Sequence, residues 1–132
     1  MAELKVHKEL AAQLLVAAKR SDPVKEWPIT VDAAFYAVFH LMEALNAADC
    51  RDSYTFGDAD DLLTHFLADE LGEAFAKRYR YGFYFRRGVI YGPHFPKANQ
   101  VIQFLRSCEE DYAHVLSVLE RREAQEGVSV DG

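Results

Sequence analysis

Apolar residues recur at steps of three and four along most of this chain, the spacing that places them on one face of an α-helix. Breakers rich in proline and glycine interrupt the pattern at Ser21–Pro23, at Gly72 and at Tyr91–Pro96. The pattern therefore predicts an all-α protein, an antiparallel up-down bundle of four main helices and a short one. The expected helices span roughly Glu3–Arg20, Val31–Ala48, Ala59–Leu71, Glu73–Ile90 and Lys97–Arg122.

The second expected helix, Val31–Ala48, is apolar on nearly every side, which is typical of a helix at the centre of a bundle. Thr30 or Asp32 is expected to cap its start. In the last expected helix, apolar residues alternate in steps of four and three, as in a bundle seam. A β-hairpin over Tyr81–Gly92, a segment rich in β-formers, is the alternative. We reject it because a lone hairpin would have no sheet to join.

Composition sets limits on the function. The chain has 132 residues, enough for one domain, which we expect to span residues 1–122 and to be followed by a disordered tail at 123–132. The net charge of −6 argues against a protein that coats nucleic acid by bulk charge, and we expect no DNA partner. No apolar run is long enough to span a bilayer, so no membrane partner is expected. Cys50 and Cys108 are widely separated, which indicates reduced thiols in a cytoplasmic protein.

Two segments resemble the HEPN family of helical domains. Ala33–Leu45, with the sequence AAFYAVFHLMEAL, is similar to the second helix of many HEPN proteins. Phe85–Gly92, with the sequence FRRGVIYG, looks like the end of their long helix, where an arginine is followed by histidine or by Asp-Tyr-Gly. Trp27-Pro28 resembles a subgroup with tryptophan just before this second helix, and the likeness spans about Trp27–Leu119.

The resemblance implies a helical bundle that often dimerises. In active family members, an Arg-x4–6-His motif from each protomer meets its partner across the interface and cleaves RNA without a metal. Many members are encoded beside a minimal nucleotidyltransferase that acts as antitoxin, and others keep the fold but lack the motif. This chain departs from the active pattern: counted from Arg86 the histidine place is Tyr91, and counted from Arg87 it is His94, with Gly92-Pro93 between.

Three hypotheses for the function follow from the resemblance. The first is a catalytically silent, nucleotide- or RNA-associated HEPN-like protein, the toxin-side or partner component of a nucleotidyltransferase pair. The absence of histidine at the Tyr91 place favours it. The alternatives are an active metal-independent ribonuclease and a purely structural bundle that binds another protein. We expect a homodimer, because aromatic residues exposed on the fourth helix need cover, and we expect no cofactor.

Arg86 and Arg87 are candidate catalytic residues, and only one of them can face inward. Arg86 shares a stripe with Phe75, Tyr79 and Gly82, so its guanidinium must meet a carboxylate, a phosphate or a partner. It either binds a phosphate of RNA or forms a structural ion pair with an acid such as Asp32 or Glu43. Arg87 shares a face with Phe83 and Ile90, and the sequence does not choose between the two arginines.

The remaining site candidates also have two interpretations each. His94 follows the helix end and is either a general base for a ribose 2′-hydroxyl or a surface loop residue. Tyr36 and His40, one turn apart, form either a polar patch near Arg86 or a hydrogen-bonded pair that holds two helices in register. Tyr91 either stacks on a base or covers the core.

A cluster of basic and aromatic residues in the fourth helix suits a single strand of RNA or a nucleotide. Its aromatic side could equally pack inward or against a second subunit. Its members are Lys77, Arg78, Arg80, Arg86 and Arg87, interleaved with Tyr79, Tyr81, Phe83, Tyr84 and Phe85. A metal site from His40-x-x-Glu43 and Asp111-x-x-His114 is disfavoured, because one pair is reversed relative to di-iron bundles and the other has aspartate. We therefore expect no metal.

Overall fold

The computed structural model describes residues 2–48, 68–92 and 94–126, and over these ranges the protein is all-α, as predicted. The segment Tyr81–Gly92 is helical up to Ile90, so the hairpin alternative is excluded. Most of the third expected helix, together with Cys50, lies outside the described residues. The described helices are α1 (Ala2–Arg20), α2 (Trp27–Ala48), α4 (Ala68–Leu71), α5 (Glu73–Ile90) and α6 (Ala98–Glu126).

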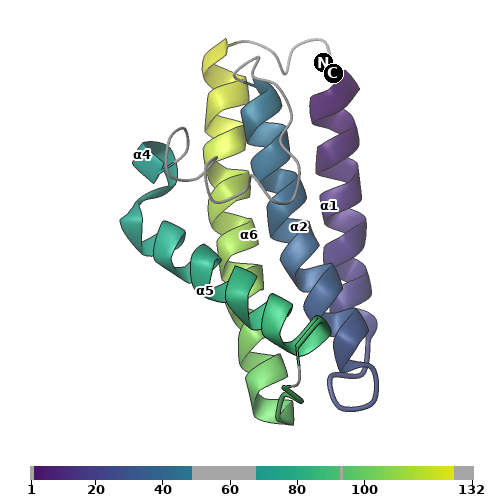
Figure 1. Cartoon of the computed structure of the whole chain (residues 1–132). Coiled ribbons are helices and arrows are strands. Elements are labelled where there is room, and N and C mark those ends of the chain that lie inside the picture. The colour runs from purple at the N-terminus through teal and green to yellow at the C-terminus, as the bar shows by residue number, and fades with distance from the viewer. Residues whose placement is uncertain (1, 49–67, 93, 127–132) are drawn as a thin grey trace.

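Three long helices, α1, α2 and α6, lie side by side, and α5 crosses in front of α2 and α6 at an oblique angle (Figure 1). Chain direction alternates from α1 to α2 to α5 to α6. Because α5 is strongly tilted, α2 and α6, which run in the same direction, pack directly on each other. The regular antiparallel up-down packing that the sequence predicted stays a prediction. None of the described helices is sufficiently long and apolar to cross a membrane.

Helix α2 is the centre of the bundle, as its apolar pattern predicted. Nearly all of its side chains from Thr30 onward are buried. It begins at Trp27, earlier than expected, because a proline such as Pro28 fits the first turn of a helix without loss of a hydrogen bond. Thr30 and Asp32 lie inside the helix, so the prediction that one of them caps it is wrong.

Two glycines delimit α5. Gly72, the predicted break, precedes the helix with a φ of +92°, a backbone conformation that favours glycine. At the other end the amide of Gly92 donates a hydrogen bond to the carbonyl oxygen of Gly88 at 3.1 Å. A Cβ atom at Gly92 would lie 2.6 Å from that oxygen, so this sharp exit from the helix requires glycine.

Helix α6 follows the predicted seam but is longer than expected. The seam residues Val101, Cys108, Val115 and Leu119 are buried. The helix continues to Glu126, and within this extension the carboxylate of Glu123 accepts a hydrogen bond from the Nζ of Lys8 on α1 at 3.0 Å. The first residues of the expected tail are therefore helical, and residues 127–132 lie outside the described part of the chain.

Candidate functional site

Arg86 is the inward-facing arginine of the pair. It is 2% exposed, whereas Arg87 is exposed. The Nε of Arg86 donates a hydrogen bond to the Oδ1 of Asp32 at 2.6 Å, an ion pair that joins α5 to α2. The structure thus contains the ion pair with Asp32 that the sequence offered as one of two environments for a buried guanidinium.

Aromatic rings enclose the guanidinium of Arg86. Its Cζ atom lies 4.8 Å from the ring centre of Tyr36, 5.4 Å from that of Tyr91 and 5.7 Å from that of Phe35. Burial opposes the charged form, but hydrogen bonds with Tyr91 and Asp32 outweigh it and raise the pKa of Arg86 above its ordinary value. The arginine therefore stays charged, stabilised by cation–π contacts as well as by the carboxylate.

The partner carboxylate faces an apolar groove. The side chain of Asp32 is 43% exposed, and together with Tyr36 it lines a cavity of about 520 Å³ between α1, α2 and the end of α5. The other lining residues include Leu14 and Ile90. Burial is the main cause that raises the pKa of Tyr36, so its hydroxyl is neutral at physiological pH and is able to donate a hydrogen bond. An anion reaching Arg86 from this side has to compete with Asp32.

His94 lies on the surface beside the last turn of α5. A Cβ atom at Gly88 would lie 3.5 Å from the Cδ2 of His94, so the loop after α5 folds back along the helix. The histidine is exposed, as is Arg87, the residue before Gly88. The structure therefore places His94 on the same end of α5 as Arg87, and its catalytic role stays a prediction.

Tyr36 and His40 belong to two different contacts. Tyr36 contacts Arg86, whereas the Nδ1 of His40 lies 3.1 Å from the Nδ1 of His7 on α1. Burial and the nearby His7 lower the pKa of His40. The contact of His40 that joins two helices is therefore with His7 on α1, and the ring of His40 also lies 6.2 Å from that of Tyr36 on its own helix. His7 was not among the predicted site residues, although it occupies a regular step of the apolar stripe between Leu4 and Ala11.

The basic and aromatic residues of α5 divide between two faces. On the inner face, Tyr79 is buried, and the guanidinium of Arg78 pairs with the buried carboxylate of Asp111 at 2.9 Å. Burial raises the pKa of Asp111, and the hydrogen bond from Arg78 acts against that rise.

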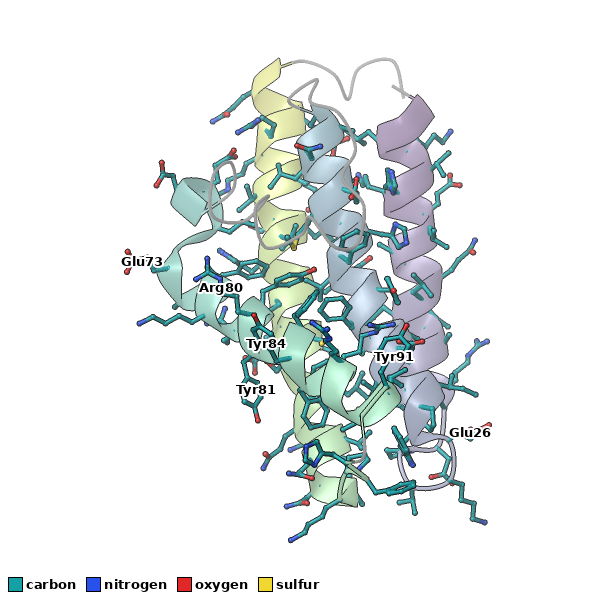
Figure 2. The ribbon with its side chains drawn as sticks, viewed as in Figure 1. Glu26, Glu73, Arg80, Tyr81, Tyr84 and Tyr91 are labelled. Atoms are coloured by element: carbon teal, nitrogen blue, oxygen red, sulfur yellow. The ribbon has the colours of Figure 1, made fainter. Side chains whose placement is uncertain are left out.

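The outward-facing members form a regular line that we name the outer α5 stripe. Its residues follow one another at steps of three and four: Lys77, Arg80, Tyr84, Arg87 and Tyr91. Tyr84 is 64% exposed and Tyr91 is 73% exposed, while Arg80 is half-buried. Figure 2 shows Arg80 and Tyr84 projecting from α5 and Tyr91 just beyond its end. Cations and phenol rings thus follow one another along the outer side of α5 and its end.

The two ligand pairs weighed for a metal site make other contacts. His40 contacts His7, Asp111 pairs with Arg78, and the Nε2 of His114 lies 2.8 Å from the carbonyl oxygen of Leu71. Within residues 2–48, 68–92 and 94–126, no three His, Cys, Asp or Glu side chains gather closely enough to hold a metal ion.

Compared with known proteins, the chain matches no protein-family model and no curated protein. The HEPN resemblance therefore depends on the sequence segments themselves, chiefly Ala33–Leu45 and Phe85–Gly92. These two segments contact each other in the structure, because Arg86 lies over the rings of Phe35 and Tyr36.

Proposed function

We propose that this chain is a catalytically silent, HEPN-like module that binds single-stranded RNA along the outer α5 stripe. The succession of exposed Lys77, Tyr84, Arg87 and Tyr91 on this face is the observation that carries the proposal. In single-strand binding, cations follow the phosphates and aromatic rings stack on successive bases. A strand bound to one helix face suits a protein whose net charge is −6, since only a local basic site is needed.

The contacts of Arg86 favour a silent module over a ribonuclease. Its guanidinium is held by Asp32, and Tyr91 covers it at the position where active family members have histidine. In the ribonuclease alternative, Arg87 would stabilise the phosphate, and His94, exposed at the same end of α5, would remove the proton of a 2′-hydroxyl. RNA cleavage that is lost in both Arg87→Ala and His94→Ala would establish this alternative.

The expected protein partners belong to the same proposal. A HEPN-like bundle of this kind would form a homodimer and pair with a nucleotidyltransferase antitoxin. The exposed tyrosines of α5 support an interface as well as an RNA surface, because Tyr81 is 71% exposed and Tyr84 is 64% exposed. Loss of RNA binding on dimer formation, measured by light scattering together with anisotropy, would assign this face to the second copy instead.

Fluorescence anisotropy with a short labelled single-stranded RNA tests the proposal. We expect Tyr84→Ala to weaken binding by about five- to a hundredfold, because stacking contributes roughly 1–3 kcal/mol per base. Arg87→Ala should also weaken binding, whereas Arg20→Ala, which removes an equal charge from an exposed position on α1, should leave it unchanged. Equal affinity in all four proteins would refute the proposal.

The salt dependence gives a second, independent measurement. If Lys77, Arg80 and Arg87 each contact a phosphate, the logarithm of the binding constant should fall against that of the salt concentration with a slope of about −2. Arg87→Ala should make this slope shallower by about 0.7, and Arg20→Ala should not change it.

A further inference from the structure

A second, separate cavity lies between α5 and α6, with α2 as its floor. Its volume is about 290 Å³. Phe35 and Val38 of α2 form the floor, and Tyr79 and Phe85 of α5 face Phe104 of α6. The outer α5 stripe does not contribute to its lining, so the two features can be tested apart.

The tilt of α5 creates this space. A Cβ atom at Gly82 would lie 3.3 Å from the Cε1 of Phe104, so the two helices approach each other closely at this glycine. Helices that cross at an oblique angle separate on either side of their closest point. The gap here is lined by side chains of both helices and is not filled by them.

The walls of the cavity suit a flat ring. The ring centres of Phe85 and Phe104 are 4.9 Å apart, and Tyr81 stacks on Phe85 at 6.4 Å with an interplanar angle of 17°. Tyr79 contributes a buried ring, 3% exposed. Ligand cavities commonly hold about 300–1,000 Å³, and this one, at about 290 Å³, is just below that range. Its size therefore suits one base or nucleoside rather than a longer chain.

Polar groups lie around the same cavity. Gln100, Gln103 and Ser107 of α6 belong to its lining, as does the ion pair of Arg78 with Asp111. Amide side chains both donate and accept hydrogen bonds, and a hydroxyl does the same. Aromatic walls with such groups match the two parts of a nucleobase, a flat apolar face and an edge of donors and acceptors.

We infer that this cavity takes up a single nucleobase, stacked among Phe85, Phe104 and Tyr79, with its polar edge toward Gln103 and Ser107. The inference rests on the proposed function in so far as a bound RNA strand is the source of the base. Tyr81 lines the cavity and is 71% exposed, and its side chain projects from α5 (Figure 2), so the cavity is bordered by a ring that solvent reaches. A free nucleoside supplies the same ring and edge, so the experiment includes both sources.

Titration of the whole chain with each of the four ribonucleosides, followed by NMR or calorimetry, tests the cavity without RNA. We expect at least one nucleoside to bind. Ser107→Phe should fill the cavity and weaken this binding at least about tenfold, a loss comparable to that of one stacked base. Ser117→Phe, the same change at an exposed position on α6 outside the cavity, is the matched control and should bind as the unmodified protein does.

Gln103→Ala supplies a second variant that removes part of the polar edge without adding bulk, and circular dichroism verifies that each variant is folded. If Ser107→Phe fails to fold, weaker binding by Gln103→Ala alone supports the inference, and unchanged binding overturns it. Absence of nucleoside binding, or full binding by folded Ser107→Phe, also overturns it. If indole binds as tightly as any nucleoside, the inference is also overturned, because the polar edge of the base would then contribute nothing to the affinity.

Anisotropy of labelled RNA with Tyr84→Ala and Arg87→Ala, compared with the nucleoside titration, separates this inference from the proposed function. If RNA binding depends on Tyr84 and Arg87 but no nucleoside binds, the proposed function stands and the cavity inference fails. If nucleosides bind in the cavity but Tyr84→Ala and Arg87→Ala leave the affinity for RNA unchanged, the proposed function fails. The cavity is then a site for free nucleosides.

Discussion

Arg86 and Arg87 are neighbours in the sequence, yet they occupy opposite environments. Arg86 is 2% exposed and is held by Asp32 and three aromatic rings, whereas Arg87 is exposed on the outer α5 stripe. Successive residues of a helix point about 100° apart, so one helix presents one arginine to the core and the next to solvent. A buried cation has to be paired to be tolerated, while an exposed one is available to a ligand.

The largest expected difference concerns stability. Arg86→Ala should lower the free energy of unfolding by about 2–3 kcal/mol, because it removes a buried ion-pair partner and its ring contacts while Asp32 regains water only in part. Arg87→Ala should change it by less than about 0.5 kcal/mol. Urea denaturation followed by circular dichroism measures both. Equal losses would mean that burial does not distinguish the two arginines.

Gly88 and Gly92, one helical turn apart at the end of α5 that orients Tyr91 over Arg86, give a second comparison. Gly92→Ala should destabilise the protein by about 1–3 kcal/mol, since its Cβ atom would overlap the carbonyl oxygen of Gly88. Gly88→Ala should instead stabilise it by about 0.5–1 kcal/mol, because alanine favours helix and its Cβ atom meets His94 at an ordinary distance of 3.5 Å. Thermal denaturation gives the sign of each change, and destabilisation by both would disprove the expected fit at Gly88.

The smallest expected effect concerns the contact of His40 with His7 on α1. Because the pKa of His40 is lowered below 6.5 in the folded state, the unfolded chain gains this proton first as the pH falls. The free energy of unfolding should therefore decrease from about pH 6.5 downward until the folded-state pKa is passed, and this contribution should be constant above pH 6.5.

Urea denaturation at a series of pH values measures this slope. His40→Gln should flatten it, and His94→Gln, a change at an exposed loop position, should retain it. A slope that is unchanged in His40→Gln would assign the acid sensitivity to other groups.

Much of the fold could be predicted because helix formation is a local matter. The steps of three and four, the apolar circumference of α2 and the break at Gly72 are all properties of short segments, and each was confirmed. The start of α2 was placed too late, at Val31, although a proline such as Pro28 is compatible with a first helical turn. The end of α6 was placed too early because the contact of Glu123 with Lys8 comes from a distant helix.

The sequence by itself determined where the described helices form and that an arginine at the end of α5 would face inward. Only the tertiary structure decided that this arginine is Arg86, that Asp32, 54 positions away, is its partner, and that His40 meets His7. It also decided the tilt of α5, which opens the cavity beside Phe104. The physical reason is that helix periodicity depends on bonds between near neighbours, whereas partners across helices depend on crossing angles and on how side chains fill the space between them.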